Sequence, residues 1–128
     1  MEPIYLDNNA TTRVDPAVVD AMLPFFTEHF GNASSIHAFG SEVGKALKKA
    51  RSQVQALLGA EHDSEIIFTS CGTESDSTAI LSALKAQPDR NTVITTNVEH
   101  PAILTLCDWL EKEGYIVHKL KVDKKGRI

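Results

Sequence analysis

The chain has 128 residues, enough for one modest domain, and its 42% hydrophobic and 23% charged content is ordinary for a globular protein. A formal net charge of −4 without a basic stripe argues against nucleic acid as the main partner. No apolar run approaches the roughly 20 residues that a membrane-spanning helix needs, and the N-terminus lacks the segments of a signal peptide. The two cysteines, Cys71 and Cys107, are therefore expected as free thiols in a cytoplasmic protein.

The N-terminal part of the sequence predicts a short strand, a polar loop and a first helix. Ile4–Leu6 has strand propensity, and the polar run 7–12 favours a loop that is, at its simplest, a well-bonded turn. Asp15–Pro16 is a helix start, with an N-cap followed by proline at the first helical position. This helix is expected to run toward Phe30, with a kink or an early stop at Pro24.

A longer helix is predicted in the next segment. The polar loop 31–37 is rich in small residues, which suit a connector and a ligand-facing loop equally well. From about Phe39 to Leu58, apolar residues recur at helical spacing, and the basic residues off that stripe are most simply a solvated face. Gly59 then provides a helix stop.

The stretch from Glu65 to Ile80 predicts a strand that passes through a tight turn into a helix. Ile66–Phe68 is a short apolar run typical of a buried strand, and apolar residues at helical spacing follow the turn. The Gly72–Thr73 turn would place free N–H groups, a hydroxyl and the positive end of a helix dipole around a phosphate. A glycine at such a turn serves packing alone just as often. The stretch contains neither a Walker loop nor a three-glycine dinucleotide motif.

Two further strands with a helix between them are predicted in the C-terminal half. The strands are 92–96 and 115–120, and the helix begins at Pro101, after a loop that ends in His100, and stops at Gly114. Together with the preceding strand and helix, this order is βαβαβ. It predicts an α/β fold with a mainly parallel sheet.

The carboxyl ends of parallel strands share one edge of a sheet, and this brings two candidate sites together. Gly72–Thr73 follows the first of the three strands and His100 follows the second, so a phosphate cradle and an imidazole would project into one crevice. A phosphorylated small molecule with a ring near His100 fits that arrangement, although a single loop histidine is more often a capping or surface residue. The other four histidines lack metal-ligand spacing, so no metal site is expected.

Cys71 lies in the same turn and offers a second chemistry. A thiol at a strand-to-helix elbow can be a nucleophile with a depressed pKa. The nucleophile elbow needs a glycine on both sides, however, and only Gly72 is present. We therefore expect Cys71 to be a small buried residue near the ligand. Cys107, on a helix among apolar residues, is expected in the core.

Four motifs in order and spacing resemble those of pyridoxal-phosphate-dependent cysteine desulfurases, most closely the nitrogen-fixation type. The resemblance covers the whole chain and implies a fold-type-I, aminotransferase-like enzyme that is homodimeric. It also implies conversion of L-cysteine to L-alanine, with the sulfur held as an enzyme persulfide and passed to an iron–sulfur scaffold protein, here for nitrogenase clusters. The motifs are Tyr5–Thr12, Gly31–His37, Thr69–Asp76 and Thr95–Ala102.

The resemblance assigns roles to individual residues. It implies that Gly72 and Thr73 bind the cofactor phosphate, and that His100 stacks against the pyridine ring and moves protons. Ala33 stands where the family commonly has proline and Cys71 where it commonly has glycine. These two departures are expected to have small effects on loop stiffness and packing. A substrate-side loop would be formed by Asn8, Asn9, Ala10 and Thr11.

Several residues that the family uses match no position in this sequence. They are the lysine that holds the cofactor, the aspartate on its pyridine nitrogen, the persulfide cysteine and the arginine that binds the substrate carboxylate. The turn residues 123–126 also lead onward, so we expect the N-terminal portion of a longer enzyme, inactive alone. Residues 1–15 would pack with its smaller domain, and residues 16–128 would begin its large cofactor-binding domain. The alternatives are a non-catalytic α/β module that binds a phosphorylated ligand, and a related selenocysteine lyase.

Overall fold

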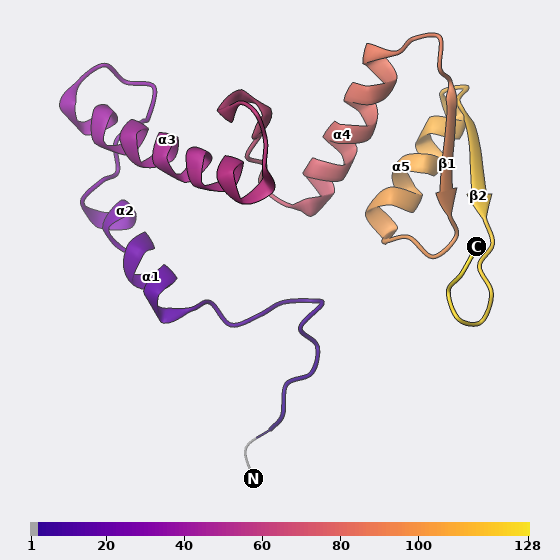
Figure 1. Cartoon of the computed structure of the whole chain (residues 1–128), viewed down its shortest axis with the longest axis horizontal. Coiled ribbons are helices and arrows are strands. Elements are labelled where there is room, and N and C mark those ends of the chain that lie inside the picture. The colour runs from indigo at the N-terminus through magenta and orange to yellow at the C-terminus, as the bar shows by residue number, and fades with distance from the viewer. Residues whose placement is uncertain (1–2) are drawn as a thin grey trace. The chain divides into compact units, whose positions relative to one another are not determined.

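The computed structural model describes residues 3–128, which form two compact units. The first unit ends at Ile67, and the second comprises Phe68–Ile128. Helices make up the regular structure of the first unit, whereas the second contains helices and both strands (Figure 1).

The first unit begins with two short helices in succession. α1 (Pro16–Met22) starts as predicted, because the Asp15 carboxylate accepts a hydrogen bond from the backbone N–H of Ala17 at 2.8 Å. α2 (Pro24–Thr27) follows after a single residue. The predicted stop at Pro24 is confirmed, since proline has no N–H with which to continue the first helix.

The long helix of the first unit is α3 (Ala38–Leu58), close to its predicted bounds. It ends at Gly59, whose φ of 70° lies in the left-handed region that glycine adopts readily. Near its start, Gly40 is buried under the preceding loop. A Cβ there would lie 2.5 Å from the carbonyl oxygens of both Asn32 and Ser35. The loop therefore packs directly on the first turn of α3.

Two strands predicted from local propensity do not form. Ile4–Leu6 is irregular and exposed, and Ile66–Phe68 is an irregular segment after the short 3-10 helix η1 (Asp63–Glu65). Ile66 is buried and its carbonyl accepts a hydrogen bond from the Arg51 guanidinium, but Ile67 is 72% exposed. Both predictions are wrong because a strand needs a neighbour for its backbone hydrogen bonds, and in residues 3–128 only β1 and β2 pair.

The second unit confirms the later part of the predicted α/β order. Its elements are α4 (Gly72–Ala86), β1 (Thr92–Thr96), α5 (Pro101–Lys112) and β2 (Ile116–Leu120). The two strands are parallel, with a register that runs from Thr92 opposite Ile116 to Thr96 opposite Leu120. α5 packs against both α4 and β2, and Figure 1 shows it between them. This is one complete βαβ unit, with α4 covering its helix.

The core of the second unit lies on the inner face of α5. Cys107 and Leu110 are both 0% exposed, which confirms the prediction for Cys107. Lys119 on β2 interacts with two acidic residues of α5. Its ammonium group pairs with the Asp108 carboxylate and lies 3.3 Å from the carboxylate of Glu111. Apolar packing and an ion-paired rim therefore attach the helix to the strand.

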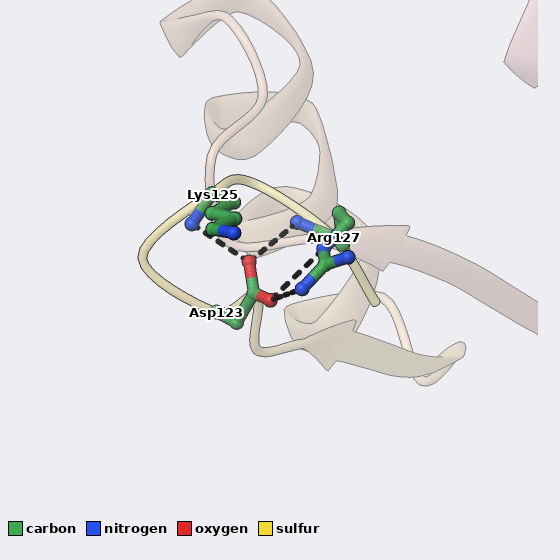
Figure 2. A network of polar contacts seen from close by, with 3 residues as sticks. All are labelled: Asp123, Lys125 and Arg127. Atoms are coloured by element: carbon green, nitrogen blue, oxygen red, sulfur yellow. Dashed lines mark hydrogen bonds and ion pairs between the residues drawn. The ribbon is translucent and has the colours of Figure 1, made fainter.

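The predicted turn at residues 123–126 is also confirmed. The N–H of Gly126 donates to the Asp123 carbonyl at 3.0 Å, and the Asp123 N–H donates to the Arg127 carbonyl at 2.9 Å. Figure 2 shows how the Asp123 carboxylate organises this turn. It accepts hydrogen bonds from the backbone N–H groups of Lys125 and Arg127 at 2.7 and 3.0 Å, and from the Arg127 guanidinium. Asp at the first turn position and Gly at the fourth are typical of a type I turn.

Candidate active site

The turn before α4 is closed by a small network of hydroxyl groups. The Thr69 hydroxyl donates to the Cys71 carbonyl at 3.2 Å and lies 2.5 Å from the Ser75 hydroxyl. The hydroxyl and the backbone N–H of Ser75 donate to the same Cys71 carbonyl, at 3.3 and 3.1 Å. These contacts fix the direction in which the chain enters α4, and so they fix the N–H groups of its first turn.

Glu74 faces back toward the residue before the helix. Its carboxylate accepts hydrogen bonds from the Ser70 N–H at 2.7 Å and from the Ser70 hydroxyl at 2.6 Å. The Ser70 hydroxyl, followed by the Ser70 N–H, lowers the pKa of Glu74 below its usual value. The negative charge in the first turn is therefore bonded to Ser70, in an arrangement similar to a capping box.

Gly72 and Thr73 are the first two residues of α4, and both are exposed. A Cβ placed on Gly72 would have no atom within 4 Å, so the space in front of the helix is open on that side. The first N–H groups of a 15-residue helix, its dipole and the Thr73 hydroxyl thus lie in one place, where the Cys71 thiol also interacts with the N–H groups of Glu74 and Thr73. This donor set suits a phosphate group.

Cys71 is the N-cap residue of α4, and its thiol is exposed. The sequence-based expectation of a buried residue is wrong here, because the cap position projects the side chain out of the helix end. The backbone N–H of Glu74 has the largest effect on the thiol and lowers the pKa of Cys71, with a further contribution from the Ser70 hydroxyl.

His100 occupies the N-cap position of α5, directly before Pro101. Its Nδ1 accepts a hydrogen bond from the Ala102 N–H at 3.2 Å. Because Nδ1 is the acceptor in this contact, a neutral ring carries its proton on Nε2. The side chain is exposed, so Nε2 is available to a ligand.

Thr73 and His100 line the same hollow, whereas Gly72 is not among its lining residues. The hollow has a volume of about 550 Å³ and is lined by the start of α4 and by α5 from its N-cap to Trp109. This volume is in the range of small-molecule sites. Other lining residues were not predicted from the sequence, among them Ser77 and Trp109. Ser77 is one turn beyond Thr73, a spacing that indicates the same helix face, whereas no sequence signal pointed to Trp109.

The loop with Asn8, Asn9, Ala10 and Thr11 belongs to the first unit, and all four residues are exposed. The Tyr5 hydroxyl donates to the carbonyls of Asp7 and Thr11 at 2.9 and 3.1 Å, and the Ala10 N–H donates to the Asp7 carbonyl at 3.1 Å. The loop is a well-bonded turn, which is the simpler of its two interpretations. Its role toward substrate stays a prediction.

A protein-family model matches nearly the whole chain. The model for class-V aminotransferases matches residues 4–128. The chain belongs to the class-V aminotransferase family. It is 77% identical over 128 residues to the cysteine desulfurase NifS of Azotobacter vinelandii. That match covers 100% of this chain and 32% of the relative, so the chain spans about a third of its length. The resemblance to cysteine desulfurases of the nitrogen-fixation type is confirmed.

Solved structures of the same family confirm the fold. A NifS-like protein superimposes with a TM-score of 0.82 at 39% identity, over 88% of this chain and 31% of the other. A second structure, titled SspA in complex with cysteine, gives a TM-score of 0.75 at 33% identity, over 87% and 32% of the two chains. The predicted α/β, aminotransferase-like class of the chain is therefore correct.

Residues 3–128 also lack two other kinds of functional feature. None of their helices is long and apolar enough to cross a membrane. No group of three or more histidine, cysteine, aspartate or glutamate side chains in that range is arranged to hold a metal ion.

Proposed function

We propose that this chain forms the N-terminal part of the cofactor site of a pyridoxal-phosphate-dependent cysteine desulfurase. The observation that carries the proposal is the shared hollow of Thr73 and His100, in a chain 77% identical to a cysteine desulfurase. A helix N-terminus with a hydroxyl suits the phosphate of the cofactor, and an imidazole beside it suits the aromatic ring. The residues present therefore fit pyridoxal phosphate.

Each residue of the site has a proposed task. Gly72 and Thr73 hold the phosphate with backbone N–H groups and a hydroxyl. His100 lies against the pyridine ring and moves a proton at Nε2, since Nδ1 is bonded to Ala102. When bound, the cofactor acts as an electron sink for the amino-acid substrate. The turn of Asn8, Asn9, Ala10 and Thr11 faces the substrate.

The proposed reaction converts L-cysteine to L-alanine while the sulfur passes to an enzyme thiol as a persulfide. L-Cysteine plus a thiol gives L-alanine plus a persulfide, so neither an external oxidant nor a reductant is consumed. We further propose a homodimer in the cytoplasm, an iron–sulfur scaffold protein as sulfur acceptor, and nitrogenase clusters as the destination. The exposed thiol of Cys71 suits a reducing compartment.

The domain assignment is part of the same proposal. Residues 1–15 would pack with a smaller domain, and residues 16–128 would begin the large cofactor-binding domain. The 32% span of the NifS relative supports this reading. The cofactor-binding lysine and the persulfide cysteine would then come from outside these residues, and the 128-residue chain alone would be inactive.

The test is an assay of the natural-length protein, the full product of the gene that encodes this sequence. With pyridoxal phosphate, it should form alanine from L-cysteine, and His100→Ala should lower kcat by about 10²- to 10⁴-fold. Thr73→Val should weaken cofactor binding by about tenfold, because one hydrogen bond to a charged phosphate is lost. His62→Ala is the matched control, since His62 is exposed in a separate loop of the first unit.

Three results would contradict the proposal or part of it. A natural-length protein that binds the cofactor without forming alanine would favour a non-catalytic phosphate-binding module. Turnover of L-selenocysteine with no turnover of L-cysteine would instead identify the related lyase. Alanine formation that survives His100→Ala undiminished would remove His100 from the proposed site.

A further inference from the structure

The four-residue loop between β1 and α5 is closed by side chains. The Thr96 hydroxyl, on the last residue of β1, donates to the Glu99 carboxylate at 2.7 Å. The same hydroxyl oxygen accepts a hydrogen bond from the Val98 N–H at 3.4 Å. Thr96 therefore uses its donor and an acceptor position at once, and both contacts close the loop on itself. A hydroxyl bonded to a carboxylate belongs to the stronger class of hydrogen bonds.

This loop connects the end of β1 to the start of α5, and hydrogen bonds hold it at both ends. On the strand side, the Asn97 N–H donates to the Leu120 carbonyl at 2.9 Å and extends the sheet by one bond beyond β1. On the helix side, the His100 carbonyl accepts from the Ile103 N–H at 2.9 Å, and its ring accepts from Ala102. The place of the imidazole relative to the sheet therefore depends on the conformation of residues 98 and 99.

Glu99 differs from its neighbours in the way it is held. Its side chain is half-buried, whereas Val98 is 61% exposed and His100 is exposed. The loop thus turns a carboxylate inward onto Thr96 and leaves the imidazole outward, in the hollow that Thr73 also lines. An acidic side chain that served only solubility would have no reason to adopt this inward position.

We propose that Thr96 and Glu99 form a latch that positions His100. The hydrogen bond between them selects one conformation of the loop, and this conformation presents Nε2 of His100 to the hollow. Because the latch acts through His100, Thr96 and Glu99 are positioning residues. The catalytic part of this inference rests on the proposed cysteine desulfurase function.

The first test is a double-mutant cycle in the natural-length protein loaded with pyridoxal phosphate. Thr96→Val and Glu99→Ala should each lower kcat by about tenfold, since a small misplacement of a catalytic group is costly. The double variant should also lose about tenfold rather than 100-fold, because both single variants break the same bond. KM for L-cysteine and the cofactor content should stay unchanged. The visible circular dichroism of the bound cofactor should fall in all three variants.

Two conservative variants and one distant variant serve as controls. Glu99→Gln retains an oxygen that accepts from Thr96, and Thr96→Ser retains the hydroxyl, so both should keep most of the activity. Glu113→Ala removes an exposed acid at the far end of α5 and should match the unmodified protein. A 100-fold loss in the double variant would overturn the latch, because the two residues would then act independently.

A second test reads the imidazole directly and needs neither cofactor nor activity. Nitrogen-15 NMR of the natural-length protein without cofactor should show His100 with its proton on Nε2, as the contact with Ala102 requires. Thr96→Val and Glu99→Ala should both shift this tautomer balance, and Glu113→Ala should not. If the protein lacks desulfurase activity, the proposed function fails and the NMR experiment alone tests the latch. An unchanged His100 signal in both Thr96→Val and Glu99→Ala would overturn the latch.

Discussion

At the scale of single residues, the two cysteines occupy opposite environments. Cys71 is exposed at the start of α4, where the Glu74 N–H and then the Ser70 hydroxyl lower its pKa. Cys107 is 0% exposed in the core of the second unit, and burial raises its pKa. The thiolate is the reactive form of cysteine. The lowered pKa and the exposure therefore both make Cys71 the more reactive of the two thiols.

Iodoacetamide labelling should therefore separate the two thiols. At neutral pH, Cys71 is expected to react faster than a cysteine in an unstructured peptide, and Cys107 should react only after unfolding. Ser70→Ala should slow the reaction of Cys71, since it removes a hydroxyl that can turn its single proton from the Glu74 carboxylate toward the thiolate. Peptide mapping by mass spectrometry after timed labelling measures both rates. Equal rates for Cys71 and the peptide would contradict the pKa argument.

Asp123 predicts an acid-dependent turn. The N–H groups of Arg127 and Lys125, in that order of effect, and then the Arg127 side chain lower its pKa. A folded-state pKa below the unfolded value stabilises the turn above the unfolded pKa of about 3.9. This contribution is lost as the pH falls through the lower, folded-state value. Carboxyl carbon-13 NMR should give a titration midpoint for Asp123 below 3.9.

Asp123→Asn is the matched variant for that measurement. Its side-chain oxygen can still accept from the backbone, but it cannot ionise, so the acid-dependent part of the turn's stability should disappear. Amide exchange at Lys125 and Gly126 reads the turn locally. An Asp123 midpoint at or above 3.9 would contradict the hydrogen-bond network in Figure 2.

At the scale of elements, α5 is the centre of the second unit because it contacts both α4 and β2. Leu110→Ala should lower the free energy of unfolding by about 2–5 kcal/mol, since the truncated side chain is fully buried. Leu120→Ala makes the same chemical change at a side chain that is 37% exposed, and it should cost clearly less. Denaturant unfolding of the natural-length protein measures both. Equal losses would show that Leu110 is not the better packed of the two.

The elements also show what local sequence can predict. β1 forms at its predicted residues, and α3 begins within one residue of its predicted start, because the polarity pattern and the capping residues act locally. Ile66–Phe68 has comparable strand propensity but forms no strand in residues 3–128. Its hydrogen-bond partners would have to come from a distant part of a chain, which no local pattern encodes.

The candidate site likewise has some features that the sequence predicts and others that depend on packing. Thr73 and His100 were predicted to meet because each follows the carboxyl end of an expected parallel strand, and they do line one hollow even though the first of those strands is absent. Ser77 and Trp109 enter the hollow through the packing of α4 against α5. The exposure of Cys71 likewise depends on the geometry of the helix end. Such features need side-chain packing, which the order of elements does not specify.

At the scale of the whole molecule, the 128 residues leave much apolar surface uncovered in both units. Leu57 is 83% exposed and Leu58 is 69% exposed at the end of α3, while Ile94 is 67% exposed on β1. So many exposed apolar side chains indicate surfaces that pack against further protein segments. The chain covers 32% of the NifS relative, and under the proposed function the rest of that fold would cover these surfaces.

Under the proposed function, the 128-residue chain and the natural-length protein should differ in folding and in activity. The 128-residue chain should bind a hydrophobic dye strongly and unfold without a sharp thermal transition, because few of its side chains are fully buried. It should form no alanine from L-cysteine with added pyridoxal phosphate, because no lysine in it stands in the family's cofactor-binding motif. The natural-length protein should bind little dye, unfold in a sharp thermal transition and form alanine from L-cysteine. A 128-residue chain that melts cooperatively and binds little dye would instead be a free-standing domain, since its described residues would then suffice for a stable core.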